Sequence, residues 1–307
     1  MPAKQNRILV IRGGAIGDFI LTLPAIAALR ERFPQSGLEV IGYQHIVQLA
    51  AAGGLVDSVR SIEARAMAGF FARGGKLDTD LSHYFASFGL IISYLFDPDG
   101  IFRGNVARVS TAQFIQGPHR PDESLGLHAT EVFLKPLERL AIFDADAVPR
   151  LRVRSSPTPL NLLALHPGSG SERKNWPEAR WAELLELLFA ETQHDVLLVG
   201  GEAEGRRLQR LIAALPPARV HLALHLPLPE LAARLAQCWA FIGHDSGITH
   251  LAAALGLPLL ALWAGSAEAI WRPRGERALV LRHPAGLPNL APRAVLQRLM
   301  EFVSPTS

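Results

Sequence analysis

Residues Arg7–Asp18 read RILVIRGGAIGD, and this stretch decides the fold. Its first half is an apolar run, which is typical of a strand covered on both faces in a parallel sheet. The glycines that follow predict a loop. Apolar residues then recur at helical spacing as far as Phe33, and Pro34 ends the helix. A strand, a glycine loop and a helix in this order predict the opening of a doubly wound α/β domain.

The same alternation continues through the first half of the chain. Further strands are expected at residues 38–43, 58–62 and 89–96, and further helices at residues 44–52 and 129–142. Residues 97–127 match no regular pattern.

The alternation starts again after residues 154–159 (RSSPTP), a polar, proline-bearing stretch that is typical of a linker. The strands expected in this half are residues 161–166, 195–200, 239–243 and 258–263, and the helices are residues 177–192, 202–215, 229–236, 247–255 and 292–303. We therefore expect an α/β protein with two Rossmann-like doubly wound domains facing each other across a cleft. The expected domains are residues 1–155 and 156–307, with helix 292–303 in a position to pack back on the first.

Composition excludes several classes of protein. The chain has 307 residues and a net charge of +3, too small an excess to predict nucleic-acid binding. Cys238 is the only cysteine, which excludes an internal disulfide and a cysteine metal cluster. The apolar stretch near the start is too short for a secretory signal, and residues 248–265 contain too many polar and helix-breaking residues for a membrane span. We expect a soluble, cytoplasmic protein.

The glycine loop at residues 13–18 does not fit the common nucleotide-binding fingerprints. A dinucleotide fingerprint needs glycine where Ala15 and Asp18 stand, and the strand ending at Tyr43 lacks the acidic residue that would hold a ribose. This disfavours a nicotinamide-dependent oxidoreductase. Asp18 lies at the start of a helix, where a carboxylate either caps the helix or acts as a catalytic base, and the loop alone leaves both open.

A second loop, residues 166–177 (HPGSGSERKNWP), separates a predicted strand from a predicted helix. Backbone amides, small hydroxyl residues and the ammonium group of Lys174 together suit an anion such as a diphosphate. The alternative is a solvated loop anchored by its tryptophan.

Two more loops follow predicted strands. In residues 200–204 (GGEAE), either Glu202 or Glu204 is placed to accept hydrogen bonds from a ribose, or both are merely acidic residues of a helix's first turn. In residues 243–250 (GHDSGITH), the amides of a new helix would face an anion, and His250 could reach the same pocket. The alternative is a capping Asp245 and a hydrogen-bonded core histidine. No third ligand accompanies the histidines and Asp245, so no metal site is expected.

Taken together, these loops resemble glycosyltransferase family 9, the ADP-heptose:lipopolysaccharide heptosyltransferases. The resemblance covers nearly the whole chain. It is carried by ILVIR at residues 8–12, Gly17-Asp18, LPA at residues 23–25, Leu29, HPG at residues 166–168, KNWP at residues 174–177, Gly200-Gly201, and DSGITHLAAA at residues 245–254. The last motif is the most specific.

The resemblance implies a GT-B fold and an inverting, metal-independent glycosyltransferase that needs no cofactor. It implies that Asp18 is the general base and that Lys174 stabilises the leaving diphosphate. The implied donor-binding residues are Ser169, Gly170, Glu204 (chosen over Glu202), Asp245, Ser246, Gly247 and His250, and the implied acceptor-side loop contains Gly14 and Gly17.

The partners that the resemblance implies are an ADP-heptose or related nucleotide sugar and a lipopolysaccharide inner-core or similar glycolipid acceptor. Peripheral contact with the cytoplasmic face of the inner membrane is part of this expectation, and no nucleic acid is. Residues 264–268 (AGSAE) lack the Pro-Thr-Asp sequence often found there in the family. The alternatives are a nucleotide-sugar epimerase and a non-catalytic sugar-nucleotide-binding protein on the same fold.

Overall fold

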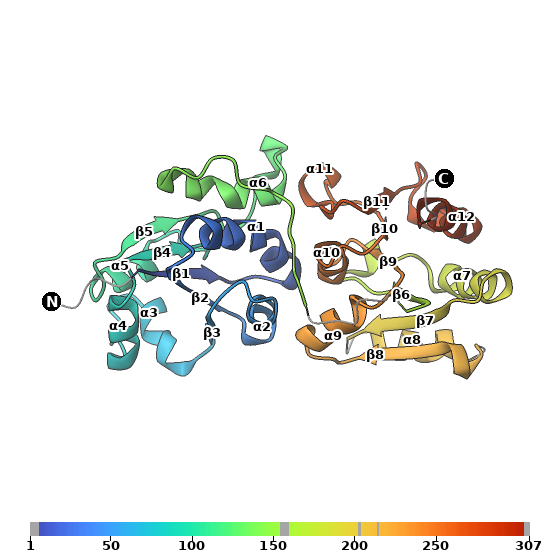
Figure 1. The fold of residues 1–307 in the computed structure, drawn as a ribbon, viewed down its shortest axis with the longest axis horizontal. Coiled ribbons are helices and arrows are strands. Elements are labelled where there is room, and N and C mark those ends of the chain that lie inside the picture. Colours follow the sequence, from blue (N-terminus) through green and yellow to red (C-terminus); the bar gives the residue numbers. More distant parts are fainter. Residues whose placement is uncertain (1–5, 154–159, 202–203, 214, 304–307) are drawn as a thin grey trace. The chain divides into compact units, whose positions relative to one another are not determined.

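The computed structural model describes residues 6–153, 160–201, 204–213 and 215–303 (Figure 1). The chain divides into two compact units, residues 1–147 and 148–307. The domain boundary expected between residues 155 and 156 lies outside the described residues.

The first unit is built on a five-stranded parallel sheet in the order β3-β2-β1-β4-β5. Its strands are β1 (Arg7–Arg12), β2 (Gly37–Gly42), β3 (Ser58–Ser61), β4 (Leu90–Ser93) and β5 (Gln113–Gln116). Its α-helices are α1 (Ile16–Arg32), α2 (Gln44–Ala52), α3 (Ala68–Phe71), α4 (Thr79–Ala86), α5 (Ile101–Ala107) and α6 (Ala129–Leu134).

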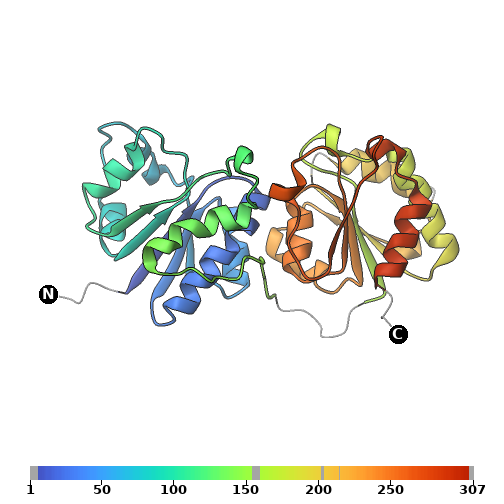
Figure 2. The ribbon, with the colours of Figure 1, turned by 90° about the horizontal axis from the view of Figure 1, so that it is seen from above.

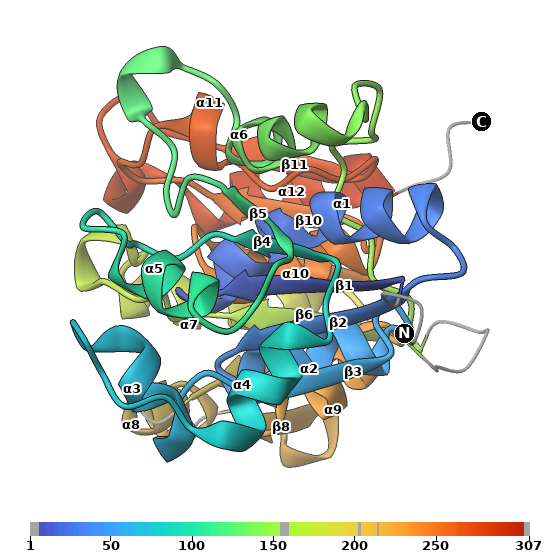
Figure 3. The ribbon, with the colours of Figure 1, turned by 90° about the vertical axis from the view of Figure 1, so that its left-hand side faces the viewer.

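The side chains of successive residues of β1 point to opposite faces of this sheet. Leu9 and Ile11 point into a core formed with α3, α4 and α5, and the alternation of side chains along a strand sends Ile8 and Val10 to the other face. There α1 packs against both α2 and α6 (Figure 3). All four side chains are buried, which explains the unbroken apolar run.

The second unit is built on a six-stranded parallel sheet in the order β11-β10-β9-β6-β7-β8. Its strands are β6 (Leu162–His166), β7 (Asp195–Gly200), β8 (Val220–Leu224), β9 (Ala240–His244), β10 (Leu259–Leu262) and β11 (Ala278–Leu281). Its α-helices are α7 (Glu178–Glu191), α8 (Gly205–Ile212), α9 (Leu228–Leu235), α10 (Gly247–Ala254), α11 (Glu268–Trp271) and α12 (Pro292–Val303).

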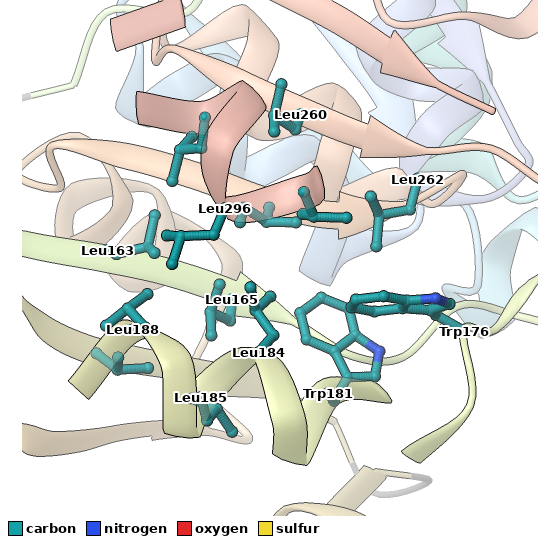
Figure 4. Packing of buried hydrophobic residues seen from close by; sticks show 14 of the residues in the cluster. Leu163, Leu165, Trp176, Trp181, Leu184, Leu185, Leu188, Leu260, Leu262 and Leu296 are labelled. Atoms are coloured by element: carbon teal, nitrogen blue, oxygen red, sulfur yellow. The ribbon is translucent and has the colours of Figure 1, made fainter. Parts of the chain in front are cut away.

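The core of this unit lies between one face of the sheet and α7, α8 and α12 (Figures 2 and 4). Trp176 and Trp181 meet edge to face, with ring centroids 5.3 Å apart. Val295, Leu296 and Leu299 of α12 are buried in the same core. The apolar face of the last helix is therefore buried within the second unit, where the sequence had suggested packing on the first; α7 offers it an apolar partner close by.

In both sheets the order of strands reverses at a central pair. In the first sheet, β2 and β3 lie in sequence on one side of β1, and β4 and β5 lie in sequence on the other side. In the second sheet, β7 and β8 lie outside β6, and β10 and β11 lie outside β9. This is the strand order of a Rossmann fold, which confirms the expected fold class. Ligands of such folds bind beyond the carboxyl ends of the two central strands.

The sequence predicted the short edge strand β3 but missed the other three short edge strands. Strands β5, β8 and β11 have four or five residues each and lie at the margins of their sheets. Their unbroken apolar runs have at most four residues, too few for periodicity to distinguish a strand from another element. Residues 97–127, left unassigned, hold α5 and β5. Within the described ranges, no helix combines the length and apolar character needed to cross a membrane.

Candidate active site

Asp18 lies in the first turn of α1, beyond the carboxyl end of β1. Its Oδ2 accepts a hydrogen bond from the backbone N–H of Ala15, at 2.9 Å. A Cβ added to Gly14, whose φ is +98°, would lie 2.8 Å from that same oxygen. The glycine therefore provides both the left-handed backbone and the room for the carboxylate. Asp18 does cap the helix, but from its third residue; its role as a base stays a prediction.

Arg12, at the end of β1, is a residue that the sequence analysis missed. Only 2% of its side chain is exposed. One guanidinium nitrogen donates to the carbonyls of His119 and Tyr94, at 2.8 and 3.3 Å, and the other lies 3.7 Å from Asp18 Oδ1. Burial lowers the pKa of Arg12, and the charge of Asp18 opposes this. The only signal in the sequence was a charged residue ending a buried strand.

Lys174 and Asp245 form an ion pair in the second unit. Lys174 Nζ lies 2.6 Å from Asp245 Oδ2, which also accepts a hydrogen bond from the Ser266 hydroxyl. The lysine side chain is 36% exposed and the aspartate side chain 9% exposed. Two motifs that the sequence could place only on neighbouring loops thus meet directly, and the ammonium keeps further N–H donors for a ligand.

The loop between β6 and α7 is held in shape by its own side chains. The Ser169 hydroxyl lies 2.7 Å from Asn175 Oδ1. Arg207, from α8, donates to the carbonyl of Pro167 at 3.1 Å and to both carboxylate oxygens of Glu172 at 2.8 Å. Gly170 is exposed. The loop is therefore an organised turn that carries Lys174 and is anchored by the buried Trp176, and its contact with a diphosphate stays a prediction.

Glu204 precedes α8 and contacts two glycine loops. Its Oε2 accepts the backbone N–H of Gly201, at 2.9 Å. A Cβ added to Gly168 would lie 2.4 Å from Oε1, so a side chain there would have to displace the Glu204 carboxylate from its present position. The glutamate thus lies at the carboxyl ends of β6 and β7, where its ribose contact stays a prediction. Glu202 lies outside the described residues.

Helix α10 begins beside these loops and is capped by Ser246. The Ser246 hydroxyl accepts the backbone N–H of Thr249 at 3.3 Å and lies 3.3 Å from His166 Nδ1. This corrects the alternative in which Asp245 is the cap, because its carboxylate is turned to Lys174 instead. Gly247 opens the helix; the cap satisfies the Thr249 amide, and the amides of Gly247 and Ile248 have no partner within the helix.

Three histidines near the start of α10 are buried. His166 and His244 are the last residues of β6 and β9, and His250 lies in α10 itself. Burial is the main cause that lowers the pKa of His166 to about 3 and that of His244 to about 4. The two rings are therefore neutral near pH 7. In the part of the chain that the structure describes, no group of three His, Cys, Asp or Glu side chains could hold a metal ion.

Known proteins resemble this chain in sequence. The profile of "Glycosyltransferase family 9 (heptosyltransferase)" matches residues 142–297, half of the chain. Lipopolysaccharide heptosyltransferase 3 of Escherichia coli is 22% identical over 84% of this chain and 83% of its own length. The chain is thus similar to a lipopolysaccharide heptosyltransferase over most of its length.

Solved structures share the fold over nearly the whole chain. A glycosyltransferase family 9 protein from Veillonella parvula has a TM-score of 0.80 at 18% identity, covering 98% of this chain and 97% of its own. ADP-heptose LPS heptosyltransferase II of E. coli has a TM-score of 0.78 at 20% identity, covering 97% and 98%. The iron-containing dodecameric glycosyltransferase TibC of enterotoxigenic E. coli is more distant, with a TM-score of 0.55 at 15% identity, covering 92% and 64%.

Proposed function

Because this chain belongs to glycosyltransferase family 9 and is a glycosyltransferase with the GT-B fold, we propose that it transfers a heptose or a related sugar. The proposed donor is an ADP-sugar. The proposed acceptor is a lipopolysaccharide inner core or a similar surface glycolipid. Relatives whose names specify lipopolysaccharide heptose transfer support this choice.

One observation carries the donor half of the proposal: Lys174 and the start of α10 converge at the carboxyl ends of β6 and β9. Lys174 pairs with Asp245, which immediately precedes the Ser246 cap of α10. An ammonium group, the amides at a helix N-terminus and small loop residues are the groups that bind a diphosphate. As the sugar departs, charge grows on that diphosphate, and fixed donors already aimed at it lower the barrier.

The acceptor half rests on Asp18. A base that removes the proton from the attacking hydroxyl typically contributes ~10²–10⁴-fold to the rate. The Asp18 side chain is 28% exposed, so a substrate hydroxyl has access to it. We propose direct displacement with inversion at the anomeric carbon, in which Lys174 and the amides supply the charge stabilisation that a metal ion supplies elsewhere.

The proposal also locates the reaction. A nucleotide sugar is made in the cytoplasm and a lipid-linked acceptor is held in a membrane, so the enzyme would act in peripheral contact with the cytoplasmic face of the inner membrane.

The test is a transfer assay with the full chain, ADP-heptose and inner-core glycolipid, in the presence of EDTA. We expect ADP release that requires the acceptor, and a product whose new glycosidic bond has the inverted anomeric configuration by NMR. Conversion of the donor without acceptor would favour an epimerase. Loss of transfer in EDTA, restored by a divalent cation, would overturn the metal-independent mechanism.

A further inference from the structure

The side chain of His244 joins the two ends of the loop that carries Lys174. His244 Nε2 accepts the backbone N–H of Trp176 at 2.8 Å, and Nδ1 lies 3.2 Å from the carbonyl oxygen of Gly168. Gly168 and Trp176 bound the segment that contains Ser169 and Lys174. One imidazole therefore spans the base of the loop.

The protonation state of this ring follows from its partners. A backbone N–H only donates and a carbonyl oxygen only accepts, so Nε2 is unprotonated and Nδ1 carries the hydrogen. The side chain is fully buried, and the Trp181 ring meets it edge to face at 5.4 Å. Burial holds its pKa near 4, which keeps this neutral tautomer at neutral pH.

The backbone of the same residue contacts the other half of the donor site. His244 is the last residue of β9, and its carbonyl oxygen accepts a hydrogen bond from the Thr249 hydroxyl in the first turn of α10. The loop bearing Lys174 and the helix bearing Ser246 and Gly247 are thus both fixed to His244.

Other contacts anchor the surrounding fold without His244. The Trp176 indole is buried in the core, where its Nε1 donates to the carbonyl of Leu290 at 3.2 Å. Arg207 holds Pro167 and Glu172 from the side of α8. Loss of the imidazole should therefore loosen the base of the loop while the core around Trp176 remains packed.

We propose that His244 is a positioning residue for the donor: its imidazole sets the spacing between Gly168 and Trp176, and thereby the placement of Ser169 and Lys174 against the diphosphate. This inference rests on the proposed function, because it assigns the loop to the donor. The substrate class concerned is a nucleoside diphosphate sugar.

The test compares His244→Phe, which removes both hydrogen bonds, with His244→Gln and His244→Asn, each able to restore one. ADP binding is measured by calorimetry, and kcat and KM for donor and acceptor are measured separately. For His244→Phe we expect an ADP Kd about tenfold higher, the size of effect that one or two lost hydrogen bonds produce. Donor KM should rise while acceptor KM stays unchanged, and at least one amide variant should recover part of the loss.

His221→Gln is the matched control. His221 is an exposed histidine at the start of β8, toward the amino edge of the same sheet, and its replacement should leave every constant unchanged. A merely structural role would lower the thermal midpoint and the amount of active protein but would not raise donor KM selectively.

The outcomes separate this inference from the proposed function. If the wild-type protein fails to bind ADP, the proposed function fails. If it binds ADP and all three His244 variants bind equally well, the positioning role is overturned. Nitrogen NMR of the wild-type protein gives an independent measurement should the variants fold poorly: an Nε2–H tautomer or a charged ring at pH 7 would also overturn the role.

Discussion

Each of the two sheets has an ion pair at its carboxyl edge, and the two pairs differ in which partner is buried, the cation or the carboxylate. In the first unit, the cation Arg12 is 2% exposed and its carboxylate neighbour Asp18 is 28% exposed. In the second unit, the carboxylate Asp245 is 9% exposed and the cation Lys174 is 36% exposed. The same strand order thus presents a carboxylate at one edge and an ammonium at the other, each oriented by a buried group of opposite charge.

A buried charge is tolerated when it is paired and hydrogen-bonded, and it then fixes the position of its partner. In the proposed function, Arg12 orients the base Asp18 in the first unit, and Asp245 orients Lys174 toward the donor in the second. Changing Asp18, Lys174 and Arg12 one at a time tests these roles.

The largest effect is expected when the exposed carboxylate of the first unit is neutralised. Asp18→Asn retains an oxygen that can accept the Ala15 N–H, so the free energy of unfolding should change little. The amide is no base, so transfer should fall by ~10²–10⁴-fold while ADP affinity is kept. Asp78→Asn, which alters a similar cap at the start of α4, is the control. Undiminished transfer in Asp18→Asn would reject the base.

The next effect is expected when the exposed cation of the second unit is removed. Lys174→Ala deletes a charged hydrogen-bond donor to the diphosphate, which is worth about 1.5–3 kcal/mol, so the ADP Kd should rise roughly 10- to 100-fold by calorimetry. Lys135→Ala removes an exposed lysine of the first unit and should leave the Kd unchanged. Equal affinities in the two variants would show that the ammonium does not contact the nucleotide.

Removal of the buried cation of the first unit tests positioning. Arg12→Met leaves the carbonyls of Tyr94 and His119 without their donor, so the unfolding free energy in urea should fall by about 1–3 kcal/mol. Transfer should also slow, because Asp18 loses its neighbouring guanidinium, while ADP affinity stays the same. A variant that is destabilised but fully active would reduce Arg12 to a structural role.

The last effect concerns pH instead of a substitution and belongs to the second unit. His166 and His244 have pKa values of about 3 and about 4 in the folded chain, below the ordinary value of 6.5. The unfolded chain therefore binds more protons as pH falls below 6.5, and stability should fall by about 1.4 kcal/mol per pH unit for each histidine until the folded-state values are reached. Urea unfolding between pH 7.5 and 5 measures this slope. A slope in His244→Asn as steep as in the wild-type protein would contradict the assignment to His244.

Much of the fold was predictable because its signals are local. The bounds of β1, α2, β7 and α12 agree with the sequence prediction, since each is an apolar run or period bounded by glycine, proline or polar residues. The edge strands β8 and β11 were missed because their apolar runs are short, four residues in β11 and three in β8, where His221 interrupts the run. The profile match and the structural neighbours confirm the family and the fold class.

The site was predictable only in part, for a physical reason. Asp18 and Lys174 could be named from the sequence because each places a charge in a polar or glycine-rich loop between a strand and a helix, and their roles stay predictions. Arg12 and His244 were missed because their partners are distant in the sequence: the Gly168 carbonyl is 76 residues from His244 and the His119 carbonyl 107 residues from Arg12. Such contacts exist only after the strands have been ordered within the sheet.

Gly168 and Gly170 illustrate what these contacts mean for anyone who wishes to alter this enzyme. Glu204 fills the space that any side chain at residue 168 would need, whereas a Cβ at residue 170 meets no atom within 4 Å. A mutagenesis library that randomises residue 170 should yield mostly folded members. One that randomises residue 168 should also yield folded members, but each replacement must move the flexible Glu204 side chain and break its hydrogen bond to the Gly201 N–H.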